Sequence, residues 1–355
     1  MIRIHAACSP GEIRAAAMDG TRLLDYAIER PGGPLAVGDR LNGRITAVIP
    51  AMAGAFVALP GTEGFLPDSQ GAAGLGVGAC VTVAVTRAPQ GDKGPRLSAR
   101  TPQAEPSPPA LLCHGPGAID RLLALHPGAA VIVDDPAIHP GGATLVPKAW
   151  DDGIEAAVES LSDPLLALPG GARASITPTP ALVAIDIDAG ATTADRRQKP
   201  AAQRATNEAA LPALARAIRL RNLSGAIVVD LAGMAAKARN ALAPAFVAAL
   251  APDPLHPRFL GFTNLGLAEI LRPRVHPPLH ELLAGPHAAA LEAVRRLVTE
   301  ATPHRLVAAP DVVSALESDT VARADLARRT GRPLISRSDP ALPPGAWRLE
   351  PISRG

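Results

Sequence analysis

Two short apolar segments, each carrying aspartate near its end, constrain this chain more than any other feature. Residues 182–188 include Asp186 and Asp188, and residues 225–231 include Asp230. Successive side chains of an extended strand point to opposite faces. Asp186 and Asp188 therefore share one face of the first strand, and apolar side chains fill the other.

A helix is predicted between the two strands. Residues 207–223 are mostly helix formers, rich in Ala, Leu and Arg. A strand–helix–strand unit can make its strands neighbours, with a right-handed crossover where they are parallel. Asp186 and Asp230 would then lie at adjacent strand ends, which favours a divalent-metal site facing an anionic substrate. The alternative is that the two aspartates only end their strands.

Composition narrows the classes of protein. A chain of 355 residues that is 47% hydrophobic can bury the cores of two or three domains. A net charge of +2 does not by itself indicate nucleic-acid binding, so any anion binding must come from local patches. Cys8, Cys80 and Cys113 form no CxxC pair, which fits a reducing cytoplasm. We find no signal peptide and no run of about 18 apolar residues that would predict a membrane span.

The first part of the chain is typical of β structure. Residues 1–35 predict short strands with a turn at Asp19–Gly20. Residues 36–100 hold several short strands at near-regular spacing with no helix between them, which favours a small barrel of the oligonucleotide-binding type. Residues 101–109 are Pro-rich and polar, as in a linker.

The rest of the chain predicts mixed α and β structure, so the fold class is α+β with several domains. Helix and strand patterns alternate from residue 111 to about 171, including a strand at 129–133. The acid-bearing α/β region follows. Residues 276–355 form a smaller α/β tail, with helices expected near 286–300 and 312–317.

Six motifs, in this order along the chain, resemble those of the ribonuclease E/G family. The segment Ala184-Ile185-Asp186-Ile187-Asp188 resembles the first catalytic strand of that family, and 219–230 resembles the run into the second. One short motif would be weak evidence, but six in the right order are hard to explain otherwise. The motifs lie at residues 9–20, 43–67, 91–98, 184–188, 219–230 and 265–274.

The resemblance implies a domain arrangement. An S1 domain of the OB type is inserted in an RNase H-like subdomain, a DNase I-like α/β catalytic subdomain follows, and a small α/β domain ends the chain. The implied boundaries are 1–35 and 110–171 for the RNase H-like part, 36–100 for S1, 101–109 for a linker, 172–275 for the catalytic part and 276–355 for the last domain.

The resemblance also implies an activity. The family's enzymes cut single-stranded RNA in RNA processing or decay, and they leave 5′-phosphate and 3′-hydroxyl ends. Asp186 and Asp230 match its two magnesium-binding aspartates, so Mg²⁺ is the expected cofactor and both residues the expected catalytic and metal ligands. Asp188, the third expected catalytic residue, stands where the family usually has Asn. An Asp there loses a hydrogen-bond donor and adds negative charge.

Aromatic residues of the expected barrel are candidates for RNA binding. Phe56 and Phe65 match family positions that contact RNA, and Lys93 matches a basic partner. Stacking of bases on aromatic rings tolerates any sequence and suits single strands. The alternative is that both Phe side chains are ordinary barrel core.

Two basic segments are candidates for contact with the RNA backbone. Arg196, Arg197 and Lys199 follow the first catalytic strand in a basic loop, and Arg219 and Arg221 lie in the predicted helix. Both groups could bind phosphates. The alternative for the helix is a solvated basic face.

Two features of the family are not found in this sequence. The interval 101–116 is too short to hold the family's 5′-monophosphate sensor subdomain, and residues 282–287 contain no cysteine where the family has its zinc link. We therefore expect no 5′-end sensing, no zinc, and a homodimer only if something other than zinc joins it. A second interpretation is an RNA-binding protein on the same scaffold with weak or no turnover, and a nuclease that acts on DNA is disfavoured.

Overall fold

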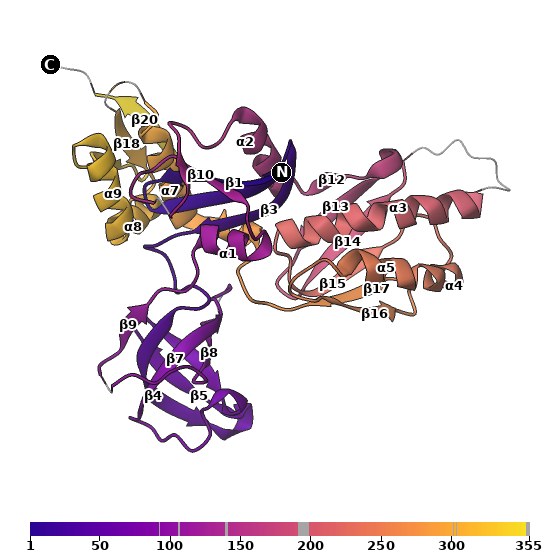
Figure 1. Cartoon of the computed structure of the whole chain (residues 1–355), viewed down its shortest axis with the longest axis horizontal. Helices are drawn as coiled ribbons and strands as arrows, with labels where there is room; N and C mark the ends of the chain where they lie inside the picture. The colour runs from indigo at the N-terminus through magenta and orange to yellow at the C-terminus, as the bar shows by residue number, and fades with distance from the viewer. Residues whose placement is uncertain are drawn as a thin grey trace. The chain divides into compact units, whose positions relative to one another are not determined.

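The structure, a computed structural model, describes residues 1–91, 93–105, 107–138, 141–190, 199–300, 302 and 304–352. The chain divides into two compact units, one of residues 1–157 with 275–355 and one of residues 158–274. It is mixed α+β, as predicted, with several sheets and one closed barrel (Figure 1). The finer identities of the expected domains stay a prediction.

The first unit begins with a sheet in the order β11-β10-β1-β2-β3. The predicted turn at Asp19–Gly20 is confirmed, because β2 ends at Asp19 and β3 begins at Arg22. Helix α1 packs on this sheet through Ile119 and Leu122. The elements are β1 (Ile2–Ser9), β2 (Glu12–Asp19), β3 (Arg22–Glu29), α1 (Ala118–Leu125), β10 (Ala130–Val133), β11 (Thr144–Leu145) and α2 (Asp152–Glu159).

The predicted barrel is present within the same unit. Its strands follow the order β5-β6-β8-β7-β4, and pairing of β4 with β5 closes it. The expected linker lies against it, since Asn42 Nδ2 donates to the carbonyl of Glu105 at 3.0 Å. The elements are β4 (Arg40–Ile49), η1 (Pro50–Met52), β5 (Gly54–Leu59), β6 (Thr62–Pro67), η2 (Asp68–Gln70), β7 (Cys80–Arg87), β8 (Arg96–Ser98) and β9 (Ala110–Cys113).

The C-terminal part is a small α/β fold, as predicted, with a sheet in the order β19-β18-β20. The helices expected near 286–300 and 312–317 are confirmed as α7 and α8. The elements are α6 (Leu279–Leu282), α7 (Gly285–Leu297), β18 (His304–Ala308), α8 (Pro310–Ser318), α9 (Thr320–Thr330), β19 (Ser336–Ser338) and β20 (Trp347–Pro351).

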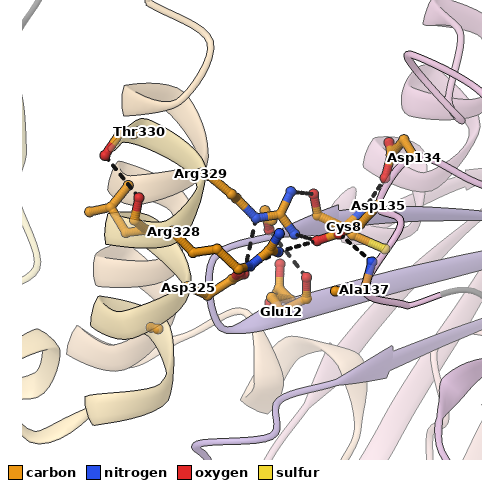
Figure 2. Close-up of polar contacts among 12 residues, drawn as sticks. Cys8, Glu12, Asp134, Asp135, Ala137, Asp325, Arg328, Arg329 and Thr330 are labelled. Carbon is orange, nitrogen blue, oxygen red and sulfur yellow. Dashed lines mark hydrogen bonds and ion pairs between the residues drawn. The ribbon is translucent and has the colours of Figure 1, made fainter. Parts of the chain in front are cut away.

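Buried ion pairs join this C-terminal part to the N-terminal sheet. Glu12 of β2, only 2% exposed, accepts from Arg30 at 2.9 Å and from Arg295 of α7 at 2.6 Å. Asp135, also 2% exposed, is bound by Arg328 and Arg329, which reach across from α9 (Figure 2). Each buried carboxylate thus has two guanidinium partners, which compensates the cost of removing its charge from water.

The second unit is built on a sheet in the order β12-β13-β14-β15-β17-β16. The two predicted acid-bearing strands are confirmed as β14 and β15, and the helix between them as α3, which begins at Lys199 rather than near 207. The elements are η3 (Ser160–Ser162), β12 (Leu165–Ala167), η4 (Pro169–Gly171), β13 (Arg173–Pro178), β14 (Leu182–Asp188), α3 (Lys199–Leu220), β15 (Gly225–Asp230), α4 (Ala236–Arg239), η5 (Asn240–Leu242), α5 (Ala243–Leu250), β16 (Arg258–Phe262) and β17 (Ala268–Arg272).

The two faces of this sheet differ. Ile185, Ile227 and Val229 are buried in one core with residues of α3 and α5, which lie along that face (Figure 1). The alternate residues of β14 and β15 point to the opposite face and are exposed or half-buried, Asp186 and Asp230 among them. The sheet therefore has a helix-covered face and an open face, and the acids lie on the open one.

We found no membrane-spanning candidate. Among the residues that the structure describes, every helix is too short or too polar to cross a bilayer.

Candidate metal and nucleic-acid site

The strand pairing brings the two predicted metal ligands together. β14 and β15 are parallel neighbours, and Asp186 pairs directly with Asp230 in their register. Residues paired in this way lie on the same face of a sheet. Asp186 is exposed and Asp230 half-buried, so both carboxylates are accessible from the open face.

Asp188 lies one step further along the same face. Its Oδ1 accepts a hydrogen bond from the backbone N–H of Gly190 at 2.9 Å, and its cross-strand neighbour on β13 is Arg173. One oxygen of Asp188 is thus used by the loop that follows β14. The carboxylate does what an Asn oxygen could also do, but it adds a charge beside Asp186.

Arg239 is a residue of this site that we did not predict from the sequence. Its Nη1 donates to Asp230 Oδ1 at 2.8 Å and to the carbonyl of Gly266 at 2.7 Å, and its Nε donates to the carbonyl of Met234 at 2.9 Å. Arg239 therefore fixes one carboxylate oxygen of Asp230 and leaves the other. Its position, nine residues after Asp230, follows no strand or helix period that could have indicated it.

Asn207 was expected only as the start of a helix, yet it positions the site. It is fully buried in α3, its Nδ2 donates to the carbonyl of Ala232 at 2.9 Å, and its Oδ1 accepts from the N–H of the same residue at 3.0 Å. This pair of bonds holds the backbone just after Asp230 against the helix. Asn207 is fully buried, and both the oxygen and the nitrogen of its amide are hydrogen-bonded, as buried polar groups require. The structure shows this burial, but the sequence could not have indicated it.

The carboxylate oxygens of this site suit Mg²⁺, an ion that does not need a complete set of protein ligands. Among the described residues there is no group of three or more His, Cys, Asp or Glu side chains that could hold a metal ion. Mg²⁺ is usually bound through one or two carboxylates, with water and substrate phosphate completing its octahedron. Asp186 and the oxygen of Asp230 that no described residue binds supply that minimum.

In the barrel, the two predicted aromatic residues lie side by side outside the core. Phe56 of β5 pairs with Phe65 of β6, and their ring centroids are 5.6 Å apart in an edge-to-face arrangement. Both are half-buried, whereas their neighbours Val57 and Leu66 fill the barrel core. The barrel-core alternative for the two Phe residues therefore does not hold, and their contact with RNA stays a prediction.

Basic side chains accompany the aromatic pair. The guanidinium carbon of Arg96 lies 5.9 Å from the centroid of the Phe65 ring, a contact that we did not predict. Lys93 is exposed in the turn before β8. Stacked rings beside cations are the arrangement that single-strand-binding barrels use.

The predicted basic residues near the acids separate into three groups. Arg221 is buried, and its guanidinium donates to the carbonyl of Asp163 at 2.6 Å, so it stabilises the fold and we leave it out of the RNA surface. Arg219 is half-buried on α3. Arg196 and Arg197 lie outside the described residues, and of Lys199 only the backbone, at the start of α3, is described.

Comparison with known proteins gives one family. Residues 148–275 match the model of the Ribonuclease E/G family. Ribonuclease E of Nostoc sp. (strain PCC 7120 / SAG 25.82 / UTEX 2576) is 34% identical over 171 residues, which are 44% of this chain and 25% of that protein. Ribonuclease G of Haemophilus influenzae is 33% identical over 132 residues, 37% of this chain and 27% of that protein.

A third relative, Ribonuclease E of Synechocystis sp. (strain ATCC 27184 / PCC 6803 / Kazusa), is 32% identical over 134 residues, 38% of this chain. The matched part of this chain spans only 20% of that protein, and about a quarter of the other two. The family match includes β14, α3, β15 and β17, the elements that carry the aspartate pair and its supports.

Proposed function

We propose that this chain, whose residues 148–275 match the model of the Ribonuclease E/G family, is an Mg²⁺-dependent endoribonuclease of that family. Its substrate is single-stranded RNA, and its products carry 5′-phosphate and 3′-hydroxyl ends. The observation that supports this proposal most is the direct pairing of Asp186 with Asp230 on the open face of the sheet. Enzymes of this family generally use a divalent metal ion.

The residues of the site would divide the chemistry between them. Asp186 and Asp230 would hold the metal through carboxylate oxygens. Bound Mg²⁺ would supply an activated water and neutralise charge that develops on the scissile phosphate. Arg239 restrains Asp230 through one oxygen, and Asn207 restrains the backbone that follows it, so the second ligand is pre-oriented before any RNA arrives.

The barrel would act as the RNA-binding part, in the manner of an S1 domain. Phe56 and Phe65 present ring surfaces at the barrel exterior. Arg96 lies near the Phe65 ring, and Lys93 precedes Arg96 in the chain. Bases would stack on the rings while the cations meet the phosphates. The RNase H-like and DNase I-like identities of the remaining parts belong to the same proposal.

The test is cleavage of a 5′-labelled, A/U-rich single-stranded RNA. Wild type would be incubated with Mg²⁺ and with EDTA, beside Asp186→Asn and Asp230→Asn. Glu208→Gln is the matched control, because Glu208 is an exposed acid on α3 of the same unit. Internal cuts that need Mg²⁺, persist in the control and vanish in both Asn variants are the expected result.

A second function, RNA binding without turnover, is favoured by one observation. Arg239 already neutralises Asp230, so the pair carries less negative charge toward a metal than two free aspartates would. Equal RNA binding without any cut, in wild type and in both Asn variants, would establish this alternative. Products that end in 3′-phosphate would also contradict the proposed chemistry.

A further inference from the structure

The open face of the second unit carries a cation beside the aspartate pair. In the strand register, Arg173 of β13 lies directly opposite Asp188 of β14. Ser175, two residues further along β13, lies opposite Asp186. Directly paired residues point to the same face of a sheet. Arg173 therefore shares the open face with both aspartates of β14.

The burial of β13 agrees with this orientation. Ala174 and Ile176, which alternate with Arg173 along the strand, are 0% and 3% exposed and lie in the core with α3 and α5. Arg173 itself is exposed. On its other side, β12 places Ala167 next to it, and a methyl group offers no hydrogen-bond acceptor to a guanidinium. The Arg173 side chain is therefore accessible from the open face.

Arg173 has no polar partner among the residues that the structure describes. No ion pair or side-chain hydrogen bond joins it to Asp188 or to any other described residue. The Oδ1 atom of Asp188 accepts instead from the backbone N–H of Gly190, at 2.9 Å. Arg239 differs, because its guanidinium donates to Asp230 and to backbone carbonyls. The guanidinium donors of Arg173 thus remain for a ligand.

Backbone contacts hold the start of β13 in place. The carbonyl of Ala172 accepts from the N–H of Leu168 at 2.9 Å. Gly190 has φ of +65°, and a Cβ there would lie 3.2 Å from the carbonyl oxygen of Gly171. A larger residue at position 190 would crowd the turn before β13 and would be strained at this φ. Arg173 and the aspartates are therefore carried on paired strands, which hold side chains more precisely than loops do.

The distance from Arg173 to the metal site suits the length of its side chain. Diagonal neighbours on adjacent antiparallel strands lie about 7–8 Å apart, and this relation holds between Arg173 and Asp186. The long side chain of arginine spans a distance of that order. A phosphate that contacts a metal ion between Asp186 and Asp230 lies on the same face. The guanidinium would therefore meet that phosphate from the β13 side.

We propose that Arg173 binds the phosphate that is cut, by donating from its guanidinium to a non-bridging oxygen. The forked donors of arginine match the oxygens of a phosphate, and a fixed positive charge stabilises the charge that develops there during reaction. This inference rests on the proposed function for its reaction. Water bonds to phosphorus, the bond from phosphorus to the 3′ oxygen breaks, and the proton lost by water balances the one gained by that oxygen. Arg173 keeps its own protons throughout.

The first test is cleavage kinetics with Mg²⁺. The control is Arg204→Ala, because Arg204 is exposed on α3, which lies along the opposite face of the sheet. We expect Arg173→Ala to lower kcat roughly 10–100-fold, the cost of one lost hydrogen bond to a charged group, with a smaller change in KM. Guanidinium ion at a non-denaturing concentration should restore part of kcat. A purely structural role would not respond to added guanidinium.

A conservative variant and a double-mutant cycle separate phosphate binding from simple compensation of Asp188. Arg173→Lys should retain an intermediate kcat, because it keeps the charge but not the fork of donors. If Arg173 only neutralised Asp188, Arg173→Ala would have no effect in the Asp188→Asn background. We expect the loss of kcat to persist in that background. Its disappearance there would overturn the inference in favour of charge compensation.

RNA binding in EDTA tests the contact without any cleavage. Anisotropy of a fluorescent single-stranded RNA would be measured across a salt series, and thermal melts would confirm that the variants fold. Arg173→Ala should reduce the slope of log K against log salt by about 0.7 relative to Arg204→Ala, the value for one phosphate contact on a single strand. If wild type cuts no RNA, the proposed function fails and this slope alone decides the role of Arg173. Unchanged slope and unchanged kcat in Arg173→Ala would overturn the inference and leave the proposed function standing.

Discussion

Glu12 and Asp135 of the first unit and Asp186 of the second lie in opposite surroundings. Glu12 and Asp135 are each 2% exposed and each bound by two arginines. Figure 2 shows the two arginines that bind Asp135. Asp186 is exposed, and its carboxylate has no ion pair or hydrogen bond with any residue that the structure describes. The same chemical group is therefore buried and paired at Glu12 and Asp135 but exposed at Asp186.

The difference separates structural acids from acids available to a ligand. A buried carboxylate with two guanidinium partners has its lone pairs used and its charge compensated. An exposed carboxylate on an open sheet face stabilises little but can still coordinate a cation. Asp230 stands between these cases, since Arg239 uses one of its oxygens and leaves the other.

The largest expected effect is on the stability of the first unit. Glu12→Gln should lower the free energy of unfolding of the first unit by about 3–5 kcal/mol, because it leaves Arg30 and Arg295 without their counter-charge. Urea unfolding would be followed by tryptophan fluorescence, since both tryptophans, Trp150 and Trp347, lie in that unit.

The matched variant is Asp186→Asn, followed by far-UV circular dichroism. It should change stability by less than about 0.5 kcal/mol, the usual size for an exposed position. If Asp186→Asn lowered the free energy of unfolding as much as Glu12→Gln, the distinction between buried, paired acids and exposed acids would not hold.

A smaller effect is expected at Arg239, the partner of the half-buried Asp230. Arg239→Ala should reduce cleavage by roughly 10–100-fold, the usual cost of losing a group that orients a metal ligand. The half-saturating Mn²⁺ concentration, measured by electron paramagnetic resonance without RNA, should rise as well. Arg239→Lys should recover only part of both, because it keeps the charge but not the forked set of donors. Metal affinity and cleavage equal to wild type would show that Arg239 only supports the loop.

How far the sequence could predict this molecule depends on the range of each interaction. β14 and β15 follow from alternation, and α7 and α8 from helical periodicity, because these patterns lie within a few residues. The bond between Arg295 and Glu12 joins residues 283 positions apart. No local pattern marks such a pair, so the buried, paired acids could not be predicted.

The same limit applies to the site. Asp186 and Asp230 could be predicted because a strand–helix–strand unit makes its strands neighbours. Arg239 could not, since its contact with Asp230 depends on how the chain after β15 folds back to the sheet. Arg221 looked available on a helix, but its guanidinium is buried on backbone carbonyls of residues before β12.

Acid titration sharpens the comparison further. Burial alone would raise the pKa of Asp135, but the N–H of Ala137 and the guanidinium groups of Arg328 and Arg329 outweigh it and hold the pKa below 3.8. The stability that this carboxylate contributes is complete above pH 3.8 and is lost as the pH falls through the lowered pKa. Asp135→Asn should therefore flatten the acid limb of a plot of tryptophan-monitored stability against pH. An unchanged acid limb would assign acid unfolding to other groups.

The smallest expected effect concerns Asp188. It lies two residues from Asp186 on one face, about 7 Å away, where a charge in water contributes about 0.6 kcal/mol. Asp188→Asn should therefore raise the half-saturating Mg²⁺ concentration about threefold and leave the melting temperature unchanged. A drop in affinity as large as that of Asp186→Asn would make Asp188 a direct ligand.

The pairing of Asp186 with Asp230 has a consequence for how the gene can change. Both acids reach the open face because each occupies the right parity in its strand, and a shift of one residue turns a strand's side chains to the other face. Point substitutions along the exposed positions keep that parity. A single-codon insertion or deletion within β14 or β15 would turn one acid toward the helix-covered face of the sheet. We therefore expect this part of the gene to tolerate point substitutions but not insertions or deletions.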